Sequence, residues 1–238
     1  MSKTIALITA GGSGHRMGSD TKKQYIEIRN KPILAHTIHR FQITEQIDEI
    51  VITVPEEDID FVRHNIVERY NFTKLKRIIP RGLTRQDSVS KALDNIDTDD
   101  DDIILIHDAV RPFISHEIIT ECINSLSDAD GSIVGIKPVN TIKQLSDSYV
   151  GSTLDRNDLI SVQTPQTFRF GLIKKCHNAA KENKFNATDD SALLEKFGET
   201  VLGRQPVISV VQGNSFNIKI TDRNDLVIAS AIMDSLSI

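Results

Sequence analysis

Apolar segments of strand length alternate with segments of helical periodicity along the whole chain. Fully apolar runs such as 103–106 are typical of buried strands, whereas apolar residues that recur every three or four positions are typical of amphipathic helices. Strands are expected at 4–8, 49–54, 76–80, 103–106, 131–136, 161–168, 207–211 and 217–221, and helices at 31–41, 56–70, 84–96, 115–126, 170–181, 191–197 and 221–238. This order predicts a single three-layer α/β domain over residues 1–238, with a mixed, mostly parallel sheet.

The segment 139–157 breaks this alternation because it is too polar to belong to the core. Two strand-like stretches, 141–145 and 149–156, flank a turn at 146–148, which predicts an inserted β-hairpin. An isolated hairpin is only marginally stable in water. We therefore expect this arm to project from the domain and to lean on a second subunit.

A glycine-rich loop follows the first strand directly. Gly11, Gly12 and Gly14 permit positive φ angles and let backbone N–H groups approach an anion closely. Arg16 and Lys23 stand just behind the loop, and fixed cations beside a glycine cradle suit a polyphosphate. The loop is therefore interpreted as a phosphate-binding loop, and the alternative is a tight turn with solvated basic residues.

Two widespread phosphate-binding motifs do not fit this loop. The dinucleotide fingerprint requires a glycine three positions after Gly14, where Met17 stands. The P-loop requires Gly-Lys-Ser/Thr, but Gly14 and Gly18 are followed by His15 and Ser19. The loop therefore belongs to neither class.

A second glycine, Gly82, follows the expected strand 76–80 and precedes a helix start. Thr84 is a good N-cap, and Arg85 and Ser88 fall on the first turns of the helix. This pattern fits a second close approach to a ligand, and it fits an ordinary capped helix equally well.

The buried strand 103–106 delivers His107, Asp108 and Arg111 at its carboxyl end. Ligands of open α/β sheets bind beyond the carboxyl ends of the strands. Asp108 is therefore a candidate ligand of Mg²⁺ on nucleotide phosphates, which commonly takes one or two carboxylates from the protein. Alternatively, Asp108 and Arg111 only pair with each other.

Composition limits the partners. The net charge of −5 argues against general binding to nucleic acid, which requires a basic face. The two cysteines, Cys122 and Cys176, are too few for a disulfide framework or a zinc site. No apolar stretch reaches the length of a membrane span, so a cytoplasmic protein without a membrane partner is expected.

Taken together, these motifs resemble the Rossmann-like nucleotidyltransferases of glycosyltransferase-A type, and specifically the 2-C-methyl-D-erythritol 4-phosphate cytidylyltransferases. The resemblance covers nearly the whole chain. It rests on the segments 10–18, 23–25, 87–89, 107–112, 154–156, 163–168, 188–190 and 217–221.

The resemblance implies roles for individual residues. Nucleotide binding falls to Ala10, Gly11, Gly12, Gly14, Arg16, Lys23, Gly82, Asp87, Ser88 and Ala109. The catalytic cations are Arg16, Lys23 and Lys219. The sugar-phosphate pocket consists of Asp108, Thr141, Arg156 and Lys219, with Thr188 reaching in from the partner subunit. The substrates are then CTP and a polyol phosphate, the cofactor is Mg²⁺ or another divalent cation with Asp108 as its ligand, and the segment 139–157 is the clasp of a homodimer.

The chain departs from the pattern of that family at four positions, Gly11, Lys22, Asn140 and Ile160. None of these removes a charged catalytic group, but Asn140 and Ile160 flank the expected sugar pocket. The segments 155–157 and 188–190 resemble the methylerythritol branch, so 2-C-methyl-D-erythritol 4-phosphate and the non-mevalonate pathway to isoprenoid precursors are expected. The alternative is ribitol 5-phosphate, the substrate of a closely related group of cytidylyltransferases in wall and capsule synthesis. Two remoter alternatives are a dinucleotide-dependent oxidoreductase and a non-catalytic nucleotide-binding protein.

Overall fold

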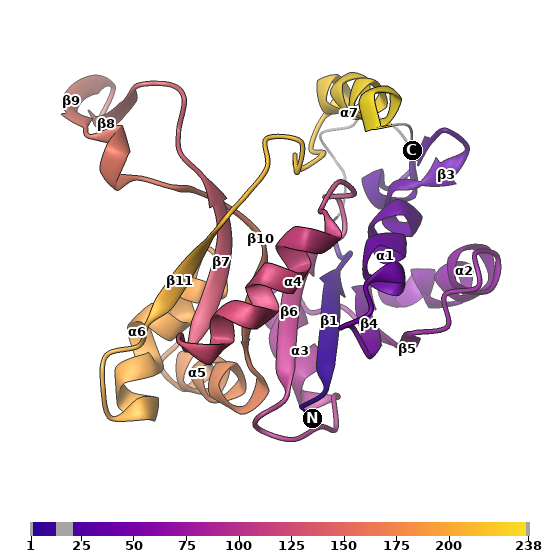
Figure 1. Ribbon diagram of the computed structural model, residues 1–238, viewed down its shortest axis with the longest axis horizontal. Helices are drawn as coiled ribbons and strands as arrows, with labels where there is room; N and C mark the ends of the chain where they lie inside the picture. Colours follow the sequence, from indigo (N-terminus) through magenta and orange to yellow (C-terminus); the bar gives the residue numbers. More distant parts are fainter. Residues whose placement is uncertain (1, 13–20, 237–238) are drawn as a thin grey trace.

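A computed structural model of the protein describes residues 2–12 and 21–236. Its centre is a seven-stranded sheet with the order β11-β7-β10-β6-β1-β4-β5 (Figure 1). The strands are β1 (Thr4–Thr9), β4 (Glu49–Val54), β5 (Leu75–Pro80), β6 (Ile103–Asp108), β7 (Gly131–Ile136), β10 (Ser161–Arg169) and β11 (Ile208–Gln212). Only β10 runs antiparallel to its neighbours, β6 and β7. The predicted mixed, mostly parallel sheet is confirmed.

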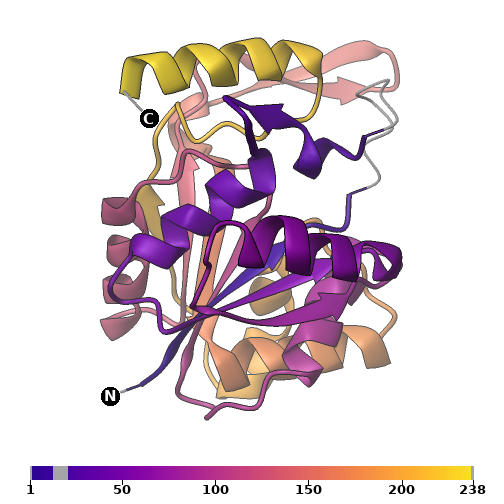
Figure 2. The same cartoon turned by 90° about the vertical axis from the view of Figure 1, so that its right-hand side faces the viewer.

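Helices cover both faces of this sheet, as the alternation of side chains along its strands requires. On β1, Ala6 and Ile8 face one hydrophobic cluster, whereas Ile5 and Leu7 face the other. The first cluster packs under α1 (Ile33–Ile43), α2 (Ile59–Val62) and α4 (His116–Asn124), and the second under α3 (Arg85–Asp94), α5 (Phe170–Glu182) and α6 (Ser191–Leu202). Figure 2 shows the resulting layers, with α7 (Arg223–Leu236) lying across one end. The three-layer α/β architecture is therefore confirmed.

Two expected elements differ from the structure. The predicted helix at 56–70 is divided into a 3₁₀ turn at Glu56–Asp58, the short α2 and a π-helical segment at Arg63–Glu68. The expected strand at 217–221 is absent, because this segment crosses the carboxyl end of β6 instead of lining a sheet edge. A backbone hydrogen bond from Ile220 N to Val110 O (2.9 Å) holds the segment there.

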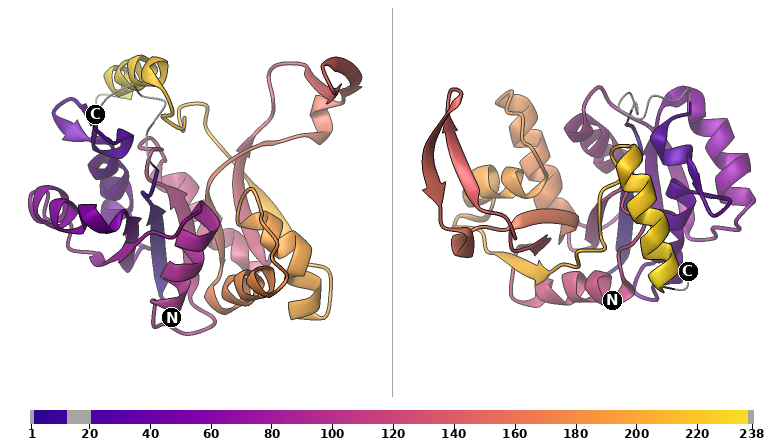
Figure 3. Two further views of the ribbon diagram at one scale, coloured as in Figure 1. Left: turned by 180° about the vertical axis from the view of Figure 1, so that it is seen from behind. Right: turned by 90° about the horizontal axis from the view of Figure 1, so that it is seen from above.

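The polar segment 139–157 contains an antiparallel pair, β8 (Ile142–Ser146) and β9 (Tyr149–Leu154). Figure 3 shows this hairpin, which we call the arm, extending away from the central sheet. A smaller pair, β2 (Glu27–Ile28) and β3 (Lys31–Pro32), lies near α7. The side chains of Leu145, Tyr149 and Val150 on the arm are largely exposed in the single chain.

Within residues 2–12 and 21–236, none of the helices combines the length and the apolarity needed to cross a bilayer.

Candidate active site

The carboxyl ends of the parallel strands meet at one edge of the sheet and enclose a cavity of about 310 Å³. Its walls come from residues 9–12 at the end of β1 and after it, 23–24, Arg81, 83–85 and Ser88 after β5, and 108–110 at the end of β6 and after it, together with Lys219. This is the edge at which ligands bind in open α/β sheets. The structure thus gathers the expected nucleotide-binding segments around one hollow. The predicted nucleotide residues Gly82 and Asp87 do not line this cavity.

The described part of the glycine loop forms one wall of this cavity. Ala10 is fixed because its N–H donates to Thr53 O (2.8 Å) and its carbonyl accepts from Gln24 Nε2 (3.0 Å). A Cβ atom on Gly12 would lie 3.1 Å from Lys23 Cε. Because glycine lacks this atom, the side chain of Lys23 can pass close to the backbone of the loop. The predicted ligand residues Gly14 and Arg16 lie outside the described residues.

The second glycine turn is a capped helix start, as one of the two interpretations expected. Thr84 and Asp87 form a capping box, with Thr84 N donating to Asp87 Oδ2 and Asp87 N donating to Thr84 Oγ1, both at 3.0 Å. Ser88 Oγ accepts from Gly82 N (3.0 Å) and donates to Thr84 O (2.7 Å). A Cβ atom on Gly82 would lie 2.4 Å from Asp87 Cβ, so only glycine fits here. Nucleotide contacts by Gly82, Asp87 and Ser88 stay a prediction.

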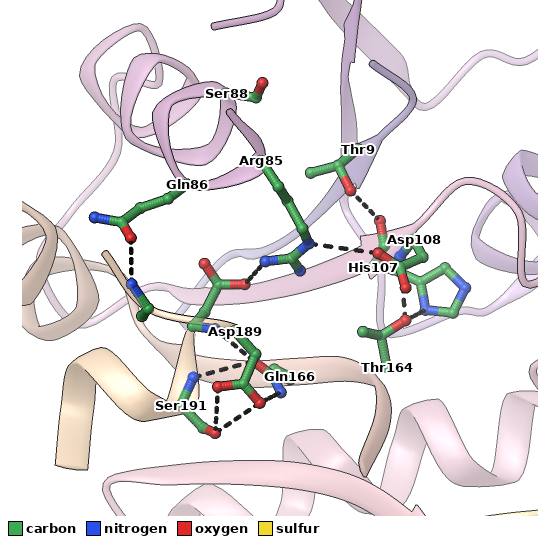
Figure 4. Close-up of polar contacts among 12 residues, drawn as sticks. Thr9, Arg85, Gln86, Ser88, His107, Asp108, Thr164, Gln166, Asp189 and Ser191 are labelled. Carbon is green, nitrogen blue, oxygen red and sulfur yellow. Dashed lines mark hydrogen bonds and ion pairs between the residues drawn. The ribbon is translucent and has the colours of Figure 1, made fainter. Parts of the chain in front are cut away.

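Asp108 ends β6 at the centre of a cluster of cations. Figure 4 shows its contact with one of them, Arg85. The carboxylate of Asp108 pairs with Lys219 Nζ at 2.9 Å and with Arg85 Nε and Arg111 Nε at 3.4 Å each. Burial alone would raise the pKa of Asp108, but the charges of Arg85, Lys219 and Arg111 outweigh burial and hold it well below its usual range. The pairing with Arg111 that the sequence left open is therefore present, within a larger network.

A second cavity, of about 240 Å³, lies on the other side of Asp108. Its walls include Arg111, the early residues 162–166 of β10, and Thr188 and Asp189 before α6. Arg85, Asp108 and Lys219 line both cavities. These three side chains therefore form a wall that the two cavities share.

Thr188 lines the second cavity of its own chain. The side chain of Gln166 explains the placement, because its Oε1 accepts from Asp190 N (2.9 Å) and its Nε2 donates to Asp189 Oδ2 (2.7 Å). These bonds hold the segment 188–190 against β10, next to the strand that carries Asp108. The expectation that Thr188 reaches into the pocket of a partner subunit stays a prediction.

Thr141 and Arg156 lie on the arm, and neither lines the two cavities of the described chain. Arg156 Nη1 donates to Val139 O (2.7 Å), which closes the base of the arm. Asn140 and Ile160, where the chain departs from the family pattern, are likewise absent from both cavity walls. A single chain therefore holds the nucleotide segments and part of the expected sugar pocket.

Arg85 is the residue at the shared wall to which the resemblance assigned no role, although the sequence left open whether its helix start approaches a ligand. Its guanidinium pairs with Asp190 Oδ2 at 2.6 Å as well as with Asp108. The one sequence feature that could have indicated a role in the site was the position of Arg85, one residue after the N-cap of a helix that begins at the carboxyl ends of the strands. Such a position gave no indication of Asp190, which is 105 residues away along the chain.

A magnesium ion could use Asp108 as one ligand, since nucleotide-bound Mg²⁺ takes few ligands from protein. Among the residues that the structure describes, no three His, Cys, Asp or Glu side chains cluster to form a metal site. In its described part, the chain therefore offers no metal cage of its own.

His107 fixes the backbone that carries Asp108. His107 Nε2 lies 3.1 Å from the Arg111 carbonyl, which can only accept, so this nitrogen carries the proton. Thr164 Oγ1 then donates to His107 Nδ1 (3.0 Å) and accepts from Asp108 N (3.1 Å). Burial lowers the pKa of His107 to about 4.

This histidine predicts a pH dependence of stability. Below pH ~6.5, the ordinary pKa of histidine, the unfolded chain takes up a proton that folded His107 does not. The free energy of unfolding should therefore fall as the pH drops from ~6.5 towards 4, by up to about 1.4 kcal/mol per pH unit. Urea unfolding of the wild type and of His107→Gln across this range measures the difference, and an identical slope for both proteins would contradict the prediction.

Comparison with known proteins agrees with this geometry. A model of the family described as IspD, 2-C-methyl-D-erythritol 4-phosphate cytidylyltransferase, matches residues 4–235. A protein of that name from Geotalea uraniireducens is 39% identical over 236 residues, which cover 99% of this chain and 98% of the relative. Its counterpart from Clostridioides difficile is 42% identical and covers 96% and 92%, respectively.

A solved structure shows the same similarity. The crystal structure of 4-diphosphocytidyl-2C-methyl-D-erythritol synthase from Anaerococcus prevotii superimposes with a TM-score of 0.85 at 32% identity, covering 98% of this chain and 96% of that one.

Proposed function

The chain belongs to the 2-C-methyl-D-erythritol 4-phosphate cytidylyltransferase family, and from this membership we propose that it joins CTP to 2-C-methyl-D-erythritol 4-phosphate. The products are the CDP-linked methylerythritol and pyrophosphate, and the reaction belongs to the non-mevalonate route to isoprenoid precursors. The observation that carries the proposal is the shared wall of Arg85, Asp108 and Lys219 between two cavities. This assignment takes the place of the oxidoreductase alternative.

The reaction is a displacement at phosphorus. An oxygen of the methylerythritol phosphate attacks the α-phosphorus of CTP, a new P–O bond forms, and the bond to the bridging oxygen breaks to release pyrophosphate. The attacking phosphate monoester has its second pKa near 6 and is already an anion at neutral pH. The chain therefore needs no general base, and its task is to bring two polyanions together.

Cations along the cavities perform this task. Lys23 lines the first cavity, and Lys219 lines both of them. We propose that Lys23 and Lys219, with Arg16 from outside the described residues, stabilise the charge that develops on the transferring group and on pyrophosphate. Asp108 would then orient Lys219, to which it is already paired.

We propose that Mg²⁺ enters with CTP and that Asp108 is its protein ligand. When bound, the ion would neutralise part of the triphosphate charge. The protein's own contribution is the positioning of both substrates.

We also propose that the enzyme is a homodimer whose pockets are completed by the arm. The arm leaves Leu145, Tyr149 and Val150 without cover, and two-fold contact with a second chain would bury these side chains. The second cavity already contains Thr188 of its own chain. Arg156 and Thr141 would therefore enter it from the partner subunit, which reverses the direction expected for Thr188.

Nucleotide selectivity tests the assignment of the first cavity. CTP with Mg²⁺ should raise the melting temperature far more than ATP or GTP with Mg²⁺, because a cavity of about 310 Å³ lined by Ala10, Leu83 and Ser88 suits a pyrimidine. Differential scanning fluorimetry at equal nucleotide concentrations measures this effect. Equal shifts for all three nucleotides would contradict the assignment.

A further inference from the structure

The side chain of Arg85 is held at the shared wall by two carboxylates at different distances. Its Nη1 lies 2.6 Å from Asp190 Oδ2, whereas its Nε lies 3.4 Å from Asp108 Oδ1. Charge-assisted hydrogen bonds are normally about 2.7–2.9 Å long, so the contact with Asp190 is close and the contact with Asp108 is loose. Asp190 therefore anchors the guanidinium, and Asp108 only faces it.

Asp190 is built as an anchor. Its side chain is 1% exposed, and its second oxygen, Oδ1, lies 3.2 Å from Nε2 of the equally buried His177 on α5. Its backbone N–H donates to Gln166 Oε1 on β10. Three separate elements thus meet at Asp190: α3 and α5 contact its buried carboxylate, and β10 binds its backbone N–H.

Stability alone does not account for this arrangement. Removing two charges from water costs more than their attraction usually returns, and apolar residues often replace a buried ion pair without loss. The guanidinium is moreover not sealed in the core, because the Arg85 side chain is 28% exposed and lines both cavities. A buried anchor that holds a partly exposed cation at a ligand wall is typical of a positioned binding group.

The donors of Arg85 leave room for a ligand. A guanidinium carries five N–H groups in a fixed fork, and the two contacts above use one on Nε and one on Nη1. The remaining donors suit the oxygens of a phosphate, for which the planar fork of arginine is well shaped. When phosphates occupy the cavities, the loose contact with Asp108 can be exchanged for them while Asp190 keeps the side chain in place.

We propose that Arg85 is a catalytic residue that contacts the phosphates of both substrates where they meet, and that Asp190, supported by His177, is the positioning residue that fixes it. The proposal rests on the proposed cytidylyltransferase function. It adds Arg85 to the cations of the active site and Asp190 as the residue that positions it. Burial would lower the pKa of Arg85, but Asp190 and Asp108 raise it, so the group is a permanent cation.

The test compares single and double variants in an assay of pyrophosphate release from CTP and methylerythritol phosphate. Activity of the wild type is measured first, and its absence would overturn the proposed function before any variant is considered. In an active enzyme, Arg85→Ala should lower kcat about 100-fold, the scale of one lost charge contact in a transition state. Guanidinium ion at millimolar concentration should restore part of this loss, and urea, which has a similar shape but no charge, should not.

Asp190→Asn should lower kcat about 10-fold with less effect on KM for CTP, because Arg85 is present but less constrained. The double variant should be no slower than Arg85→Ala, since the effect of Asp190 passes through Arg85. Asp130→Asn is the matched control. It breaks a similar pair with Arg204 (2.6 Å) on the opposite edge of the sheet and should leave kcat unchanged.

Full activity of Arg85→Ala, failure of guanidinium to restore activity, or additive losses in the double variant would each overturn the proposal. If Asp190→Asn does not fold, the response of Arg85→Ala to guanidinium and urea still tests the role of Arg85. The kcat of Arg85→Lys then tests whether the contact with Asp190 positions the side chain. A lysine lacks the fork that Asp190 grips, so this variant should stay at least 10-fold slower than the wild type.

Discussion

Lys219→Ala and Lys23→Ala should each lower kcat by about two orders of magnitude, the largest loss that we expect from single changes at predicted catalytic residues. Lys219 lies 2.9 Å from Asp108 and lines both cavities, and Lys23 lines the nucleotide cavity. In the proposed reaction, each would therefore stand where charge grows on the reacting phosphates. The loss corresponds to about 3 kcal/mol of barrier height, and steady-state pyrophosphate release with both substrates saturating measures it.

Lys175→Ala provides the matched control for these variants. Lys175 also pairs with an aspartate, Asp100 at 2.9 Å, but on the exposed side of α5 away from both cavities. Its removal should leave kcat unchanged, because exposed ion pairs contribute little. A folded Lys219→Ala protein with the turnover of the Lys175→Ala protein would remove Lys219 from the mechanism.

Two variants that are each nearly inactive at a low concentration of the sugar phosphate should restore each other's activity when they are mixed. Arg156→Ala removes a guanidinium from the arm, and Thr188→Val removes a hydroxyl from the second cavity. If the arm completes the partner's pocket, a mixed dimer contains one pocket with both groups intact. Random exchange of equal amounts would place an intact pocket at about one quarter of all sites, so about a quarter of wild-type activity should return.

This experiment requires subunit exchange, for example by co-refolding, and mixing either variant with itself is the control. Alone, each variant should show a raised KM for the sugar phosphate with little change for CTP. If Thr188 served only to begin α6, Thr188→Val would cost roughly 1 kcal/mol of stability and leave the kinetics normal. Lack of restoration, or a fully active monomer at assay concentration, would disprove the shared pocket.

The sequence predicted the layers of this fold because each strand and helix has a local pattern. Fully apolar strands such as β6 and the two faces of β1 are encoded by adjacent residues, and their periodicity is sufficient to assign them. The segment 217–221 shows the limit of this reasoning. It alternates like a strand, yet in the structure it crosses above β6 to bring Lys219 to Asp108.

Site residues could be predicted where they directly follow the carboxyl end of a strand. Asp108 and Arg111 were located by their place after β6, and Lys219 by resemblance to the family. Thr188 was also named by that resemblance, whereas Arg85 was not, because its position depends on a contact between distant residues. Gln166 holds the segment before α6, and Asp190 turns Arg85 towards Asp108. No local pattern encodes such contacts.

The most direct test of the account is pyrophosphate release by the purified protein with CTP, Mg²⁺ and one sugar phosphate at a time. We expect rapid release with 2-C-methyl-D-erythritol 4-phosphate, much slower release with ribitol 5-phosphate, and none when the sugar phosphate is omitted. Faster release with ribitol 5-phosphate, or no release with methylerythritol phosphate, would contradict the proposed function.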